Sequence, residues 1–124
     1  MNKIFSLSGI TTAAALVAVS ATAQVNLTAE TVTPGGSAYL APAHLTEVAA
    51  SRGIANIQLA DGQTLTNSVQ NVAEGKTDIA TTPFILPFLL SKGVGPYSSI
   101  GKEKGAELAS NLRVLYPYSL GIFF

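Results

Sequence analysis

Between Val25 and Thr82 the sequence alternates between strand-like and helix-like segments, and this order constrains the fold more than any other feature. Three short segments rich in β-branched residues are typical of strands, namely residues 25–33, 54–60 and 77–82. Strands that alternate with helices pair in parallel through right-handed crossovers. We therefore predict an α/β fold, with a mostly parallel sheet and flanking helices.

Two helices are expected between these strands. Pro42 suits the first turn of one helix, in which apolar residues recur at helical spacing until Gly53. A second helix is expected from Thr64, with Gly75 as its C-terminal cap. The apolar face of this second helix consists of Leu65, Val69, Val72 and Ala73.

Residues 83–90 form an apolar run, Pro-Phe-Ile-Leu-Pro-Phe-Leu-Leu. A transmembrane helix needs about 20 apolar residues, so this run is too short. Its two prolines also remove backbone hydrogen-bond donors, and lipid offers no replacement, so the run is not a membrane span. We expect a short helix or turn that starts at Pro83 or Pro87 and is capped by Thr82 or a neighbour. Its side chains from Phe84 to Phe88 would leave an apolar rim beside the third strand.

The rest of the chain predicts one more helix, at residues 102–110, and two more strands, at residues 112–117 and 119–124. The last of these strands ends on two phenylalanines without a polar tail. We therefore expect a sheet that is incomplete at the C-terminus, and a chain that is the N-terminal part of a longer protein.

Residues 1–23 are expected to be a signal peptide for export. Lys3 gives a positive start, residues 9–21 are apolar but too few to span a bilayer, and Ala-Thr-Ala precedes a cleavage site before Gln24. An amphipathic first helix is the alternative, which the near absence of polar residues disfavours. Residues 24–124 would then form one α/β lobe.

Composition excludes several classes of site. The chain has no cysteine and one histidine, His44, so neither a disulfide framework nor a histidine–cysteine metal cluster is possible. Seven basic and seven acidic residues give no net charge, whereas nucleic acid requires a basic surface. We predict no metal, no cofactor and no nucleic-acid partner.

Glycines and polar residues gather at the three predicted strand-to-helix junctions. The carboxyl ends of parallel strands meet at one edge, where open α/β sheets bind ligands, so the junctions are expected to line one cleft. Glycine permits close backbone approach, and the free N–H groups of a helix start favour an anion. An ordinary loop, simple capping by Thr64 and threonine as a strand former are the alternatives at the three junctions. The candidate ligand-binding residues are Gly35, Gly36, Ser37 and Tyr39, then Gln63, Thr64, Thr66 and Asn67, then Thr81 and Thr82.

Acids and bases suited to catalysis are few. Asp78 lies inside a predicted strand, Glu47 and Glu74 lie on polar helix faces, and His44 lies near a helix start. No Ser-His-Asp set follows from a single histidine. The predicted cleft, with hydroxyls, amides and backbone N–H groups, fits reversible binding better than catalysis.

The same segments resemble the TAXI family, the extracytoplasmic solute-binding proteins of one class of TRAP transporters. GGSAYLAPAHLTEVA is similar to the family's first loop and helix, and NVAEGKTDIA to its second helix and the motif that follows it. GAELASNLRVLYPYSLGIF is similar to a further family segment, in which Leu115, Tyr116 and Pro117 are the most specific residues. The resemblance covers nearly all of residues 24–124.

This resemblance implies the second type of periplasmic-binding fold, in which two α/β lobes close over a small ligand. It implies a periplasmic, non-enzymatic protein that captures an amino acid or organic acid and delivers it to the permease subunits in the membrane. It also assigns the ten candidate residues above to the binding loops. Thr64 and Leu65 replace small residues that are usual in the family, and TTPFILPF replaces a polar turn, so the cleft would be more apolar than in many relatives.

Two functions of other classes remain open from the sequence. One is an exported, hydrolase-like α/β enzyme whose catalytic residues lie in a missing half. The other is an interaction module that docks through residues 83–90. Solute binding is the leading expectation, with strand-end hydroxyls and helix N–H groups holding a polar head, and Tyr39 and the Phe84–Phe88 rim covering an apolar part.

Overall fold

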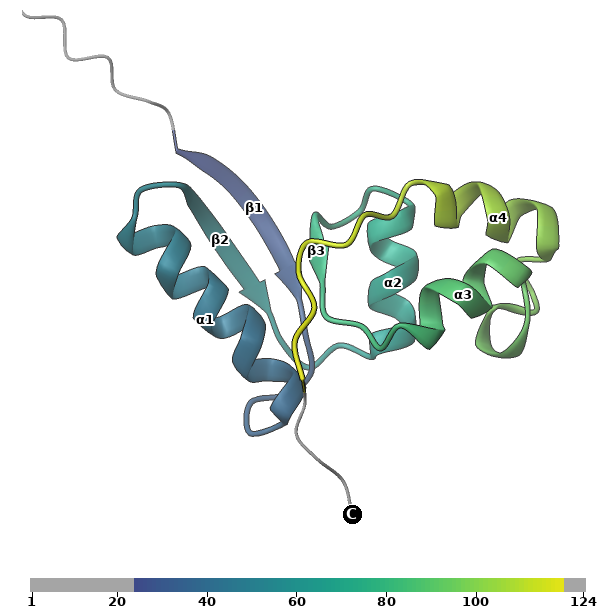
Figure 1. Ribbon diagram of the computed structural model, residues 1–124, viewed down its shortest axis with the longest axis horizontal. Coiled ribbons are helices and arrows are strands. Elements are labelled where there is room, and N and C mark those ends of the chain that lie inside the picture. Colours follow the sequence, from purple (N-terminus) through teal and green to yellow (C-terminus); the bar gives the residue numbers. More distant parts are fainter. Residues whose placement is uncertain (1–23, 120–124) are drawn as a thin grey trace, which may run out of the picture.

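The computed structural model describes residues 24–119 of the chain. The order of elements is β1 (Val25–Glu30), α1 (Ser37–Ser51), β2 (Ala55–Ala60), α2 (Leu65–Ala73), β3 (Ile79–Ala80), α3 (Ile85–Lys92), the 3₁₀ turn η1 (Gly95–Tyr97) and α4 (Lys102–Ser110) (Figure 1). The predicted alternation of strands and helices is confirmed up to α4. The predicted signal peptide lies outside the described residues, as does all but the first residue of the predicted strand 119–124.

The three strands form one open, all-parallel sheet in the order β2-β1-β3. β1 pairs with β2 along its whole length, whereas β3 pairs through Ile79 and Ala80 alone. The predicted third strand, 77–82, is shorter because side chains replace part of its ladder. The Thr28 amide donates to the Asp78 carboxylate at 2.8 Å, and the Thr77 hydroxyl donates to the Thr28 carbonyl at 3.1 Å.

Helix α1 begins five residues before Pro42, so the prediction that Pro42 lies in a first turn is wrong. A proline inside a helix has no N–H for the carbonyl four residues earlier, which here belongs to Ala38. The Thr31 hydroxyl donates to that carbonyl at 3.1 Å and the Tyr118 phenol lies at 3.5 Å from it. Donors from outside the helix thus replace the missing bond, and the helix continues through the proline.

The two faces of the sheet differ in character. The face under α1 is apolar, and its buried cluster, here called the sheet core, consists of Ala29, Ala49, Ala55 and Ile57. Because strand side chains alternate, the other face carries Asn26, Thr28, Glu30, Asn56 and Gln58. The Asn71 side chain of α2 donates to the Glu30 carboxylate at 3.0 and 3.2 Å, which places α2 on the face opposite to α1.

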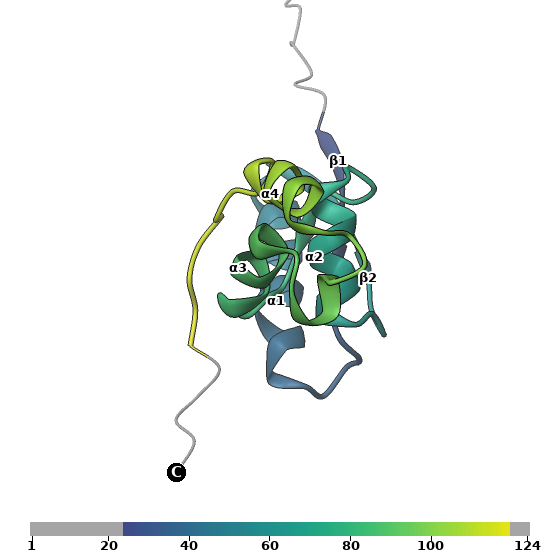
Figure 2. The same ribbon diagram turned by 90° about the vertical axis from the view of Figure 1, so that its right-hand side faces the viewer.

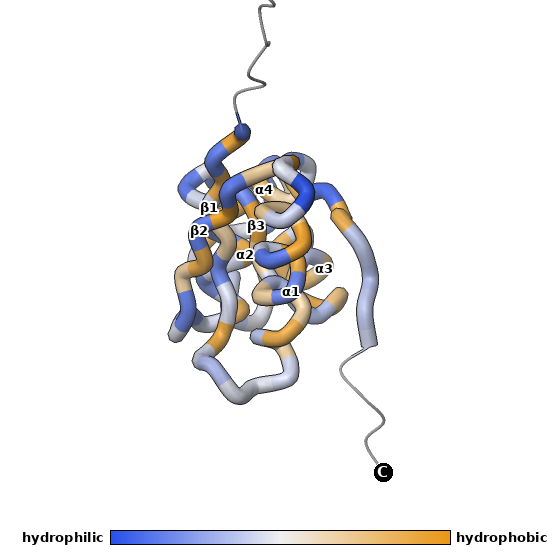
Figure 3. Tube along the Cα trace, turned by 90° about the vertical axis from the view of Figure 1, so that its left-hand side faces the viewer, coloured by the Kyte–Doolittle hydropathy of each residue, from blue (hydrophilic) through white to orange (hydrophobic). Residues whose placement is uncertain are grey.

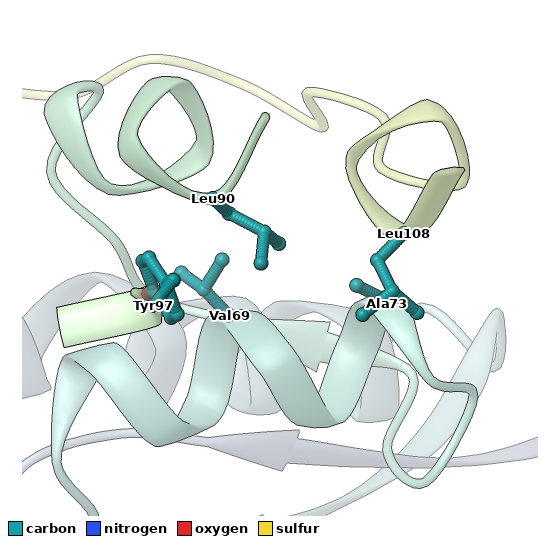
Figure 4. Packing of buried hydrophobic residues seen from close by; sticks show 5 residues of the cluster. All are labelled: Val69, Ala73, Leu90, Tyr97 and Leu108. Carbon is teal, nitrogen blue, oxygen red and sulfur yellow. The ribbon is translucent and has the colours of Figure 1, made fainter. Parts of the chain in front are cut away.

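A second buried cluster, here called the helical core, lies among α2, α3, η1 and α4 (Figure 4). It consists of Val69, Ala73, Leu90, Tyr97 and Leu108. Close approach of α4 to α3 depends on Gly105, since a Cβ there would meet the Leu90 carbonyl oxygen. The Tyr97 hydroxyl donates to the Thr66 carbonyl at 2.9 Å, so the buried phenol ties the 3₁₀ turn to the start of α2.

Helix α3 accommodates the apolar run in the way the prolines allow. Pro87 lies in its first turn, where a backbone donor is not needed, and Pro83 precedes the helix. The N-cap is Phe84, without a side-chain hydrogen bond, and the Thr82 hydroxyl donates instead to the Pro83 carbonyl at 3.1 Å. The cap is therefore a neighbour of Thr82 and not Thr82 itself, and the helix begins at Ile85 instead of at Pro83 or Pro87.

Residues 112–118, here called the strap, were predicted to be largely a strand but form no ladder with the described strands. Figures 2 and 3 show the segment after α4 running clear of the helices, and Figure 1 shows it descending in the same direction as the strands. Its contacts with α1 come from side chains, the phenols of Tyr116 and Tyr118. None of the helices within residues 24–119 has the length and hydropathy needed to cross a bilayer.

Candidate functional site

The carboxyl edge of the sheet is organised by Thr31, a fully buried residue that directly follows β1. Its amide donates to the Ala60 carbonyl at 3.0 Å, and its own carbonyl accepts from the Gln63 amide at 2.9 Å. Its hydroxyl donates to the Ala38 carbonyl in the first turn of α1. One residue therefore joins the first predicted junction to the second.

The third junction meets the same edge. The Thr81 amide donates to the Glu30 carbonyl at 3.2 Å, directly beside Thr31. The structure thus brings together all three junctions named from the sequence. Thr31 itself was missed, because the predicted first strand ran to residue 33 and placed Thr31 inside it, whereas β1 ends at Glu30.

At this edge, the starts of α1 and α2 have no capping side chain that would compete with an anion for their backbone N–H groups. Helix α1 begins after Gly36 and helix α2 after Thr64, and neither N-cap residue makes a side-chain hydrogen bond. Neither helix has an acidic residue in its first turn. The alternative interpretation of this junction, capping by the Thr64 hydroxyl, is therefore wrong, and free N–H groups with the positive ends of two helix dipoles remain at the edge.

A hollow of about 840 Å³ adjoins this edge, between α1, α2, β3, the start of α3 and the strap. This volume lies within the range of small-molecule sites. Its apolar walls come from Leu27, Ala38, Pro42, Leu45, Leu65, Val69, Val72, Ile79, Ala80, Pro83, Phe84, Pro87, Ala109, Leu112, Val114, Leu115 and Pro117. Its polar side chains are Asp78, Thr81, Thr82, Arg113, Tyr116 and Tyr118.

Only Thr81 and Thr82 of the predicted site residues line this hollow. The other eight, Gly35, Gly36, Ser37, Tyr39, Gln63, Thr64, Thr66 and Asn67, lie in the first two junctions outside it. Their neighbours Ala38 and Leu65 do line it. The candidate site therefore has two adjoining parts, a polar edge and an apolar hollow, and Thr81 and Thr82 belong to both.

The strap closes one side of the hollow with two phenols. Tyr116 donates to the Ala41 carbonyl at 3.2 Å, Tyr118 lies near the Ala38 carbonyl, and the two rings are 6.1 Å apart. Partial burial, with a smaller contribution from Tyr118, raises the pKa of Tyr116. The Tyr116 phenol therefore keeps its proton at neutral pH and remains a donor to α1.

Carboxylates near the site are engaged in holding the fold. Glu30 accepts from Asn71, and Asp78 accepts from the Thr28 amide. His44, on α1, is exposed. Within residues 24–119 no three acidic or histidine side chains are grouped so that they could hold a metal ion. The arrangement suits noncovalent binding of a small molecule.

Comparison with protein-family models, with curated proteins and with solved structures finds no match to this chain.

Proposed function

We propose that this chain is the first α/β lobe of an extracytoplasmic solute-binding protein of the TAXI type, with the second type of periplasmic-binding fold. In this proposal it captures a small organic anion or amino acid in the periplasm and delivers it to the permease subunits of a TRAP transporter. Residues 1–23 direct export, and a second lobe of a longer protein closes over the solute.

The observation that carries the proposal is the meeting of three junctions around Thr31. Ligands of open parallel sheets bind beyond the carboxyl ends of the strands, and this edge has two helix starts free of side-chain caps. Backbone N–H groups at such a position bind an anion without carrying out chemistry. The resemblance of three sequence segments to the TAXI family supports the same function.

Isothermal titration of the purified chain against amino acids and mono- and dicarboxylic acids tests the proposal. Asn67→Asp is the sharpest variant, because residue 67 is exposed in the first turn of α2. A carboxylate there favours the helix but repels an anionic solute at the edge. We expect the affinity for an anion to fall about tenfold, the equivalent of about 1.4 kcal/mol.

Ser99→Asp is the matched control, because it adds the same charge at an exposed turn next to η1. Its affinity is expected to stay within about twofold of the parent. Equal losses in both variants, or silence across the whole panel, would refute the proposal. Recovery of a chemically altered solute would favour the enzyme alternative instead.

A further inference from the structure

The hollow is elongated along β3 and the strap. Asp78 and Arg113 line it near the start of β3, whereas Thr81, Thr82 and Tyr118 line it near the carboxyl edge. Extended chain rises about 3.3 Å per residue, so the span from Asp78 to Thr82 is roughly 13 Å. A long, narrow molecule therefore fits the hollow better than a compact one.

The side chains that line the hollow along this length are mostly apolar. Leu27 and Ile79 come from the sheet, Leu45 and Pro42 from α1, and Val114 to Pro117 from the strap. The two charged side chains of the lining are already engaged. Asp78 accepts from the Thr28 amide, and Arg113 Nη1 donates to the Ser110 and Leu112 carbonyls at 2.6 and 2.7 Å.

One end of the hollow differs. Thr81 is only 7 % exposed, lines the hollow, and has a hydroxyl that makes no hydrogen bond to another residue of the described part of the chain. Ala38, in the first turn of α1, lines the same end, and the N-cap of that helix has no side-chain hydrogen bond. The Thr81 hydroxyl at the wall of the hollow and the N–H groups of the helix start together provide donors for one carboxylate.

We propose that the solute is a medium-chain monocarboxylic acid, with its carboxylate at Thr81 and the start of α1 and its hydrocarbon chain in the hollow beneath the strap. This inference rests on the proposed function, because it assigns the solute class of the same site. A dicarboxylic acid of similar length is disfavoured, because its second carboxylate would lose its water among apolar walls, at an end where the Asp78 and Arg113 side chains already have hydrogen-bond partners.

A homologous series tests the solute class. The purified chain is titrated calorimetrically with butanoate, hexanoate, octanoate and decanoate below their micellar concentrations, and with decanedioate, glutamate and succinate. Each added methylene is expected to raise the affinity roughly fourfold, the equivalent of about 0.8 kcal/mol per buried methylene. Decanedioate is expected to bind at least about tenfold more weakly than decanoate.

The outcomes separate this inference from the proposed function. Tighter binding of glutamate or succinate than of decanoate would overturn the inference and leave the proposed function standing. An affinity that does not change with chain length would overturn the inference as well. If none of the acids binds, both the inference and the proposed function are overturned. A regular rise of affinity with chain length supports both.

Two phenylalanines at the start of α3 give a matched pair of variants. Phe84, 72 % exposed, lines the hollow, whereas Phe88, 54 % exposed, does not. Because both side chains are largely exposed, aspartate is tolerated by the fold at either position. Phe84→Asp is expected to weaken decanoate binding about tenfold or more, and Phe88→Asp less than about twofold. Equal effects would overturn the placement of the chain.

A second matched pair of variants, on α1, tests the volume of the hollow instead of its charge. Leu45 lines the hollow, and Leu40, 66 % exposed, does not. Leu45→Trp is expected to abolish decanoate binding, while Leu40→Trp retains it. The chain has no tryptophan of its own, so each variant also reports its fold by fluorescence. Full binding by a folded Leu45→Trp variant would contradict the inference.

Discussion

The helical core and the sheet core differ in the size of the side chains that they bury. The helical core joins four elements through Val69, Leu90, Tyr97 and Leu108, whereas three of the four residues in the sheet core are alanines. Small side chains let α1 approach the strands closely but bury little apolar area, and burial contributes about 25 cal/mol per Å². We infer that the stability of this chain resides mainly in its helical half.

This difference also separates stability from binding. The candidate site lies where the sheet core is thin, and its edge is held by hydrogen bonds around Thr31. The helical core lies behind α2 and supports the start of that helix through the Tyr97–Thr66 bond. The helical half therefore holds the edge and, through Val69, forms part of the wall of the hollow, whereas the sheet half, with little buried area, leaves room for a solute.

Truncation in each core gives the largest expected effects. Leu90→Ala is expected to cost about 3–5 kcal/mol of unfolding free energy, because Leu90 is fully buried among large side chains. Ile57→Ala is expected to cost about 2 kcal/mol, because its neighbours are alanines and partly exposed side chains that can relax. Urea unfolding measures both. A larger cost for Ile57→Ala would reverse the inferred division of stability.

Adding one methyl group at Gly105 tests the packing of α4 on α3. In an unobstructed helix, glycine to alanine stabilises by roughly 0.5–1 kcal/mol. Here the new Cβ meets the Leu90 carbonyl oxygen, and overpacking makes Gly105→Ala destabilising by about 2 kcal/mol. Ala106→Gly, at the exposed neighbouring position, is the control and is expected to cost about 1 kcal/mol. A stabilised Gly105→Ala variant would show that the two helices are not in close contact.

Alkaline pH is expected to weaken the helical core through Tyr97, whose pKa is raised by burial. An unfolded tyrosine titrates at about pH 10, so the native state keeps its proton to higher pH. The stability that this residue contributes is complete below about pH 10 and is lost as the pH rises through the native pKa. Urea midpoints at about pH 8 and about pH 11 should therefore differ more in the parent than in Tyr97→Phe. Identical differences would contradict this.

The edge of the sheet should respond to loss of one hydroxyl. Thr31→Val keeps the shape of the side chain but removes the donor to the Ala38 carbonyl, and we expect a cost of about 1 kcal/mol. Thr33→Val, at an exposed position two residues later, is expected to change stability by less than about 0.5 kcal/mol. Thermal unfolding of both variants measures the difference, and matching values would leave Thr31 without its organising role.

The smallest effect is expected at Ser68. Its hydroxyl is buried and makes no hydrogen bond within residues 24–119, so Ser68→Ala removes a polar group that gains nothing from folding. We expect a change between zero and about 1 kcal/mol of stabilisation, measured by urea unfolding. A clear destabilisation would mean that the hydroxyl has a partner, such as a bound water molecule.

Much of the fold follows from local pattern. The spacing of apolar residues and the positions of Gly53 and Gly75 predict α2 and the ends of α1 and α2 correctly, and α4 occupies the predicted residues 102–110. Parallel topology alone predicts that the three junctions meet at one edge. The start of α1 could not be predicted, because Pro42 is tolerated only when Thr31 and Tyr118 supply donors from elsewhere in the chain.

The apolar half of the site could not be predicted for the same reason. The pattern of residues 112–117 is typical of a strand. However, β3 pairs with β1 through two residues alone, so it offers no long edge to which these residues could pair. The segment instead contacts α1 through Tyr116 and Tyr118, more than 70 positions away in sequence. A hollow whose walls come from so many separate segments has no local signature.

The proline inside α1 has a consequence for the order in which the molecule assembles. The Ala38 carbonyl cannot be satisfied by α1 alone, so the opening turn of that helix depends on the end of β1 and on the strap being already in position. Nucleation of α1 should therefore begin beyond the proline and spread backwards. During refolding, the backbone amides of α1 nearest the carboxyl edge of the sheet would be the last to gain protection from hydrogen exchange.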